Sequence, residues 1–162
     1  MNTSPLPESR FKRILFCTDL SESADAAFDF ALDTAIRRPG ATLYVLHVIH
    51  EPDAQFWKSY LAEVDNINND AKKVIDAKVA SAYLSRVPPG LEVKVEFRIG
   101  PDAATILEFA KARQVDLIIL GRHGHSSVGK ALFGSVAEKI VRKADCAVLV
   151  VPLAYAKAAA QA

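Results

Sequence analysis

The chain is poor in cysteine, with two in 162 residues, Cys17 and Cys146. They lie far apart and each borders an apolar run, so we expect two buried free thiols rather than a disulfide or a metal site. Free thiols fit a reducing compartment, and we expect a cytoplasmic protein. No apolar run approaches the roughly 20 residues that a membrane span needs. The segment Met1–Lys12 also lacks the apolar centre of a secretory signal.

An excess of one charge is absent as well, because 20 basic residues face 19 acidic ones and leave a net charge of +1. This balance argues against nucleic acid or a membrane surface as a partner. Hydrophobic residues make up 51% and charged residues 24%, as in an ordinary globular protein. The length predicts a single domain over residues 1–162 with its core at about 12–152. Residues 1–10 and the Ala-rich residues 153–162 are predicted to be flexible tails, the second either a frayed helix or disordered.

Apolar runs alternate with segments of helical periodicity along the chain. The pattern predicts strands at residues 13–17, 42–49, 91–99, 116–120 and 147–151, with helices at 22–38, within 55–86, from 102 to about 114, and at 135–143. Such alternation implies a parallel sheet with helices on both faces. The strand at 91–99 alternates apolar and polar residues, which places it at a sheet edge. In doubly wound α/β domains of this kind, ligands bind at the carboxyl ends of the strands, so we expect a site after strands one and four.

A glycine-bearing loop follows the fourth predicted strand. It reads Gly121-Arg122-His123-Gly124, then nine residues, then Gly134-Ser135. Glycine lets the backbone approach an anion closely, and a helix N-terminus offers free N–H groups and a positive dipole end. Ser135 adds a hydroxyl where the next helix would begin. The loop therefore favours a phosphate site of an adenine nucleotide, with a merely structural connection as the alternative.

Other motifs of phosphate or acyl chemistry are missing. Gly129-Lys130 is followed by Ala131, so the loop is not a Walker A motif, and the dinucleotide pattern G-x-G-x-x-G is absent. Ser126 and Ser127 lie outside any G-x-S-x-G elbow. We assign no catalytic residue. The histidines near the carboxyl rim, His47, His50, His123 and His125, complete no recognised metal-ligand set, and the last two are better suited to contact phosphate.

Polar residues beside the glycine loop allow two interpretations each. Asp19 follows the first strand, where a carboxylate either hydrogen-bonds ribose hydroxyls or caps the next helix. Arg122, Lys130 and Arg142 either neutralise phosphate or carry solvated surface charge. The sequence by itself leaves these alternatives open.

Taken in order, these segments resemble the universal stress protein family. Gly121-x-x-Gly124, nine residues and Gly134-Ser135 reproduce that family's ATP-binding pattern G-2x-G-9x-G-[S/T]. Thr18-Asp19-x-Ser21 resembles its first-strand turn, and Leu46-His47-Val48 resembles the end of its second strand. The resemblance covers about residues 13–152, including the helix and strand at 100–120. Cys17 departs from it, since many members have proline there.

The resemblance implies a fold and a set of contacts. The fold would be a three-layer α/β/α Rossmann-like domain, of the adenine nucleotide alpha hydrolase-like type, with a five-stranded parallel sheet in the order 3-2-1-4-5. Asp19 would lie near the ribose and the backbone of Val48 against the adenine edge. The ribose and phosphates of ATP, ADP or AMP, with Mg²⁺ possible on the nucleotide, would be surrounded by Gly121, Gly124, Gly134, Ser135 and Val136. The same motifs imply that the nucleotide also contacts Thr18, Arg122 and His123.

The resemblance also implies a homodimer formed by antiparallel pairing of the last strand, Ala147–Val151. An apolar edge strand exposes unpaired backbone groups, which agrees with this expectation. The leading functional hypothesis is a nucleotide-binding stress-response module whose bound state is recognised by an unknown regulatory protein. The alternatives are a slow ATPase or phosphotransferase, and a protein-interaction scaffold that binds no nucleotide.

Overall fold

The computed structural model describes residues 9–49, 76–123 and 134–162, and the structural statements below concern those residues. The elements are β1 (Arg13–Thr18), α1 (Glu22–Ile36), β2 (Thr42–Ile49), a helical stretch at 76–82, the short 3₁₀ helix η1 (Leu84–Arg86), β3 (Glu92–Ile99), α4 (Asp102–Ala112), β4 (Leu117–Gly121), α5 (Ser135–Lys143), β5 (Ala147–Val151) and α6 (Leu153–Gln161). Most predicted segments are confirmed to within two residues. The first part of the predicted helix within 55–86 lies outside the described residues.

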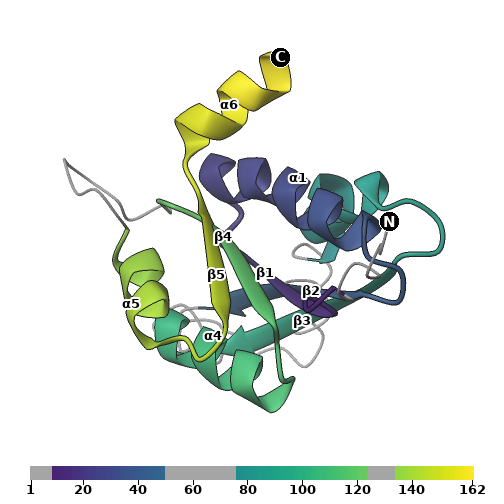
Figure 1. The fold of residues 1–162 in the computed structure, drawn as a ribbon. Coiled ribbons are helices and arrows are strands. Elements are labelled where there is room, and N and C mark those ends of the chain that lie inside the picture. The colour runs from purple at the N-terminus through teal and green to yellow at the C-terminus, as the bar shows by residue number, and fades with distance from the viewer. Residues whose placement is uncertain (1–8, 50–75, 124–133) are drawn as a thin grey trace, which may run out of the picture.

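The strands form one parallel sheet in the order β3-β2-β1-β4-β5. Phe16 at the centre of β1 is level with Val45 on β2 and with Ile119 on β4. Helices α1 and α6 and residues 76–82 cover one face, whereas α4 and α5 cover the other (Figure 1). This arrangement confirms the three-layer α/β/α fold, the strand order and the edge position of β3.

The apolar runs of the central strands follow from burial on both sides. In β1, Ile14 and Phe16 face the α1 layer, while Leu15 and Cys17 face α4 and α5. Because successive side chains of a strand point to opposite faces, a strand covered on both sides needs apolar residues at every position. The side chains on the two faces therefore form two hydrophobic cores, one against α1 and one against α4 and α5.

Helix α1 begins as its sequence predicts. The Ser21 hydroxyl accepts a hydrogen bond from the Ala24 N–H at 3.2 Å, so Ser21 is the N-cap. The helix stops at the turn before β2, where Gly40 adopts a φ of +78°, a conformation that glycine takes without strain. The cap matters for the site because it starts the helix directly after the carboxyl end of β1.

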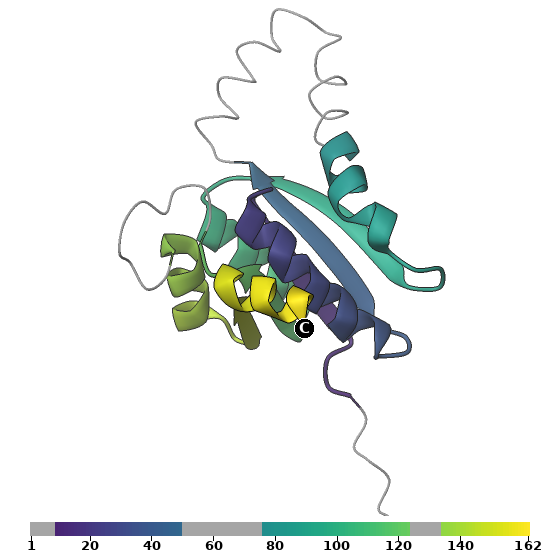
Figure 2. The ribbon, with the colours of Figure 1, turned by 90° about the horizontal axis from the view of Figure 1, so that it is seen from above.

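The C-terminal residues, for which the sequence allowed a frayed helix or a disordered tail, form a helix that packs on the rest of the domain. Residues Leu153–Gln161 form α6, which lies beside α1 in Figure 2. Ala156 is buried against α1, the rings of Tyr155 and Phe30 are 5.8 Å apart, and Lys157 pairs with Glu22 at 2.7 Å. Alanine favours helix at every position without marking one face, so composition did not reveal that this helix packs on another.

Both cysteines are free thiols, as predicted, but the expected burial holds fully for Cys17 alone. Cys17 is buried in β1, and Cys146 is half-buried just before β5. Burial raises the pKa of the Cys17 thiol far above its ordinary range, and burial also raises the pKa of Cys146. Both side chains are therefore protonated at neutral pH and act as small apolar groups of the core. In the described residues, no helix has both the length and the apolar character to cross a membrane.

Candidate functional site

The predicted site residues gather at the carboxyl edge of the sheet. Thr18 ends β1 and pairs in register with His47 on β2, while Gly121 ends β4 and pairs with Val151 on β5. Val48 lies one residue further along β2. Because all strands are parallel, their carboxyl ends meet at one edge, and the turns after β1 and β4 lie at that edge. Gly124 lies outside the described residues.

The turn from β1 to α1 is held by its own side chains. The Thr18 hydroxyl oxygen accepts a hydrogen bond from the Leu20 N–H at 2.9 Å, and Asp19 Oδ1 accepts one from the Ser21 N–H at 3.0 Å. Leu20 adopts a φ of +62°, which is rare for a residue other than glycine. Asp19 thus stabilises the turn before α1, and its contact with a ribose stays a prediction.

A buried tyrosine hydroxyl joins this turn to the segment at 76–86. The Tyr83 hydroxyl donates to Asp25 Oδ1 at 2.6 Å and lies 2.6 Å from the Thr18 hydroxyl. Tyr83 falls within the helical range 55–86 that the sequence predicts, but the sequence did not predict this role for its hydroxyl. The signal was available, because a tyrosine in an apolar stripe needs a hydrogen-bond partner for its buried oxygen.

Burial, followed by the hydrogen bond to Asp25, raises the pKa of Tyr83 above its ordinary value of 10.0. A raised folded pKa stabilises the protein fully below the unfolded pKa, and this contribution is lost as pH rises past about 10. We expect the free energy of unfolding to fall above about pH 10, and Tyr83→Phe to remove that part of the fall. Urea unfolding at pH 8 to 11 measures this fall.

Both proteins should carry Cys17→Ala as a common background. Burial also raises the pKa of the Cys17 thiol, from an ordinary value of 9.0, so its ionisation would lower the free energy of unfolding over the same pH range. Parallel pH curves for the two proteins would contradict the expectation.

Gly121 lies against the first turn of α1. A Cβ atom at this position would come within 2.5 Å of Ser23 Oγ, 2.7 Å of the Ser23 carbonyl oxygen and 2.8 Å of its carbonyl carbon. The absence of a side chain therefore lets the end of β4 pack directly on α1. Gly121 thus has a packing role that the sequence did not predict, and its contact with a nucleotide stays a prediction.

Arg122, the first residue after β4, connects three elements. The Arg122 N–H donates to the Val151 carbonyl at 3.0 Å, and the Arg122 carbonyl accepts from the Gly134 N–H at 2.9 Å. The second bond holds the start of α5 beside the end of β4, although residues 124–133 between them are not described. The two ends of the predicted glycine pattern are therefore adjacent in space.

The start of α5 is open to an acceptor. Its N-cap is Gly134, and no side chain of the described residues caps it there. Ser135 is the first helical residue rather than the cap, and the first helical bond runs from the Glu138 N–H to the Gly134 carbonyl at 3.0 Å. The N–H groups of Ser135, Val136 and Ala137 precede that bond, and such groups with the helix dipole favour an anion.

The two histidines that the structure describes at this edge have different surroundings. His47 Nδ1 lies 2.9 Å from the Thr18 carbonyl oxygen, which only accepts, so Nδ1 carries the proton. His123 Nε2 accepts from Arg122 Nε at 3.1 Å, whereas His123 Nδ1 is buried and has no hydrogen-bond partner among the described residues. Arg122 and His123 thus lie side by side after β4. Within the described residues, no three His, Cys, Asp or Glu side chains gather as metal ligands.

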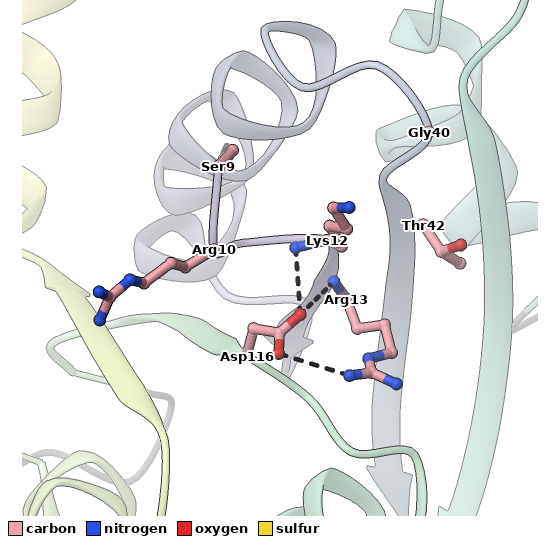
Figure 3. Close-up of a pocket in the computed structure, with 7 residues that line it drawn as sticks. All are labelled: Ser9, Arg10, Lys12, Arg13, Gly40, Thr42 and Asp116. Atoms are coloured by element: carbon pink, nitrogen blue, oxygen red, sulfur yellow. Dashed lines mark hydrogen bonds and ion pairs between the residues drawn. The ribbon is translucent and has the colours of Figure 1, made fainter. Parts of the chain in front are cut away.

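An open depression of about 600 Å³ lies at the opposite, amino edge of the sheet (Figure 3). The Asp116 carboxylate at its centre already has hydrogen-bond partners. It accepts from the backbone N–H groups of Lys12 at 3.1 Å and Arg13 at 2.8 Å. Asp116 also pairs with the Arg13 guanidinium at 3.6 Å, and the Arg10 side chain points away from it. These contacts join β1 to β4, so we assign the depression a structural role.

The profile of the Universal stress protein family matches residues 10–152. This chain belongs to the universal stress protein family. A putative universal stress protein of Staphylococcus saprophyticus is 33% identical over 145 residues, which cover 87% of this chain and 83% of that protein. The solved structure of MJ0577, a universal stress protein of Methanocaldococcus jannaschii, is 30% identical with a TM-score of 0.71, covering 89% of this chain and 97% of that one.

More distant universal stress protein structures share the fold. One, described in complex with cAMP, is 20% identical with a TM-score of 0.57 and covers 90% of this chain and 99% of its own. Another, from Arabidopsis thaliana and described with AMP bound, is 16% identical with a TM-score of 0.52 and covers 87% and 91%. At these identities the likeness shows a common architecture for the family.

Proposed function

We propose that this universal stress protein binds an adenine nucleotide, ATP first among them, at the carboxyl edge of its sheet. The observation that carries the proposal is the bond from the Gly134 N–H to the Arg122 carbonyl at 2.9 Å. It holds the uncapped start of α5 beside β4, where phosphate would meet free N–H groups and the positive end of the helix dipole. The cAMP and AMP bound by structures of the same fold support the same class of ligand.

The roles of the individual residues follow from their places. Ser135 and Val136 would offer backbone N–H groups to phosphate, and Arg122 and His123 would contribute charge and a hydrogen-bond donor. Asp19 and the backbone of Val48 would contact ribose and adenine, with Thr18 holding the turn between them. Gly121, Gly124 and Gly134 would let the backbone approach the ligand closely, and Mg²⁺ would arrive with the nucleotide.

The proposal includes a homodimer formed through β5. This strand ends the sheet order, and its Leu149 side chain is 37% exposed. An apolar edge strand favours pairing with a second copy, and the bound nucleotide would then be reported to a regulatory protein partner. Sedimentation velocity of the purified protein tests the dimer, and a monomer at micromolar concentration would contradict it.

We expect the freshly purified protein, once denatured, to release ATP, ADP or AMP near one per chain. Where the preparation is empty, calorimetry should show binding of added Mg-ATP. A Gly124→Val substitution should lower the affinity at least tenfold, because a branched side chain crowds the loop where a phosphate would approach. Mass spectrometry and titration measure both results.

The matched control is Gly90→Asn in the turn before β3. Gly90 has a φ of +88°, which asparagine tolerates, and beyond its chain neighbours no described residue places an atom within 4 Å of where a Cβ would lie. The control should bind nucleotide like the wild type. A protein that neither carries nor binds adenine nucleotide would overturn the proposal and leave the protein-interaction scaffold as the function.

A further inference from the structure

The starting observation is a chain of hydrogen bonds beneath the turn from β1 to α1. It runs from the Leu20 N–H to the Thr18 hydroxyl at 2.9 Å, on to the Tyr83 hydroxyl at 2.6 Å, and ends at Asp25 Oδ1 at 2.6 Å. The Tyr83 side chain is fully buried, and its ring packs against Phe16 and Phe28. Tyr83 is therefore too deep to touch a ligand at the sheet edge and acts on the turn from below.

The direction of each bond follows from the chemistry of the groups. An ionised carboxylate only accepts, so the single proton of the Tyr83 hydroxyl goes to Asp25. The Thr18 hydroxyl must then donate to the Tyr83 oxygen, while its own oxygen accepts from Leu20. All three donors point the same way toward one negative charge, an arrangement in which hydrogen bonds strengthen one another.

This chain of bonds holds a backbone conformation that is otherwise unfavourable. Leu20 stands at a φ of +62°, which persists only where the surroundings over-determine it. The Thr18 carbonyl is fixed from the other side by His47 Nδ1 at 2.9 Å. Asp19 lies between Thr18 and Leu20, so the placement of its carboxylate depends on both neighbours. Of the four residues in the hydrogen-bond chain from Leu20 to Asp25, Tyr83 alone comes from outside the β1–α1 segment.

We propose that the Tyr83 hydroxyl is a positioning group for the adenine-nucleotide site, which makes nucleotide affinity depend on the packing of residues 76–86 against α1. The inference rests on the proposed function. Arg86 strengthens the same packing, because its guanidinium pairs with Asp29 at 2.7 Å and lies 4.6 Å from the centre of the Phe28 ring. A partner that displaced residues 76–86 would release the turn that carries Asp19.

Thermodynamic linkage makes this dependence reciprocal. If packing of residues 76–86 raises nucleotide affinity, bound nucleotide must stabilise that packing by the same factor. The amides of Tyr83, Arg86 and Val87, which donate to carbonyls within this segment, should then exchange more slowly with nucleotide present. The Tyr83→Phe protein should lose most of this protection.

The test compares Tyr83→Phe with Tyr155→Phe. Both remove one hydroxyl and keep the ring, but Tyr155 lies on α6 with 61% of its surface exposed. We expect Tyr83→Phe to raise the dissociation constant of Mg-ATP about tenfold and Tyr155→Phe to leave it unchanged. Hydrogen exchange of Tyr83→Phe should quicken at Leu20 and Ser21 while core amides of β2 such as Val45 keep their rates. A general loss of stability would instead quicken all of them.

Two further substitutions keep the inference falsifiable if Tyr83→Phe folds poorly. Asp25→Ala removes the acceptor and should weaken binding. Asp33→Ala removes a carboxylate from the same helix, one that pairs with Arg37 at the surface at 2.7 Å, and should bind nucleotide like the wild type. If the wild type binds Mg-ATP and the Tyr83→Phe and Asp25→Ala proteins keep its affinity and its Leu20 exchange rate, the inference is wrong while the proposed function stands. If the wild type itself binds no adenine nucleotide, both are wrong.

Discussion

Gly121→Ala is expected to destabilise the protein by about 2–3 kcal/mol, the upper part of the usual cost of overpacking. The added Cβ would come within 2.7 Å of the Ser23 carbonyl oxygen and 2.8 Å of its carbonyl carbon. These are backbone atoms of the first turn of α1, so relief requires moving the helix away from β4. Urea unfolding at pH 7 measures the effect.

The control is Ser23→Ala, alone and combined with Gly121→Ala. Ser23 Oγ is buried without a hydrogen-bond partner among the described residues, so its removal by itself should cost little. In the double variant the contact with Oγ disappears but the backbone contacts remain, and we expect no recovery. Recovery to wild-type stability would show that the hydroxyl alone, rather than the backbone of α1, makes glycine necessary.

Phe28→Ala is expected to lower the free energy of unfolding by about 3–5 kcal/mol. Phe28 is fully buried, with its ring 5.1 Å from that of Phe16 and 4.8 Å from that of Tyr83. The substitution leaves a cavity between α1, β1 and residues 76–86, which these rings hold together. Denaturant unfolding at neutral pH measures the loss.

Phe30→Ala is the matched control, since it removes the same ring from the same helix. Phe30 is half-buried and its ring lies beside Tyr155 of α6 at 5.8 Å. Its side chain can be replaced in part by water and by movement of Tyr155, so the loss should be clearly smaller. Equal losses would mean that α6 contributes as much to the core as the segment at 76–86.

The strands and their order along the chain could be predicted because their signals are local. The run from Thr42 to Ile49 and the helix from Ser135 to Lys143 begin and end at the predicted residues. The cap of α1 is a local interaction of the same kind, because the Ser21 hydroxyl accepts from an N–H only three residues further along. The order β3-β2-β1-β4-β5 came from the family resemblance, which the matched profile confirms over residues 10–152.

The contacts between distant segments could not be predicted in the same way. Tyr83 and Thr18 are 65 residues apart, and only the fold brings their hydroxyls to 2.6 Å. The packing of Gly121 on Ser23 was not predicted, because the glycine motif carries no information about a residue on another element. A helix was one of the two alternatives for residues 153–162, but its packing on α1 was not predicted, because its alanines show helical propensity without marking the face that packs.

By itself the sequence determined the fold class and the family, because periodicity, capping and glycine spacing are short-range properties, and it predicted a ligand site at the carboxyl edge of the sheet. Only the tertiary structure decided which groups hold that edge in shape. The bond from Gly134 to Arg122, the packing of Gly121 on Ser23 and the hydrogen-bond chain through Tyr83 all join residues from different elements. The energies of these contacts depend on the distances between atoms of different elements, and those distances are fixed only when the chain folds.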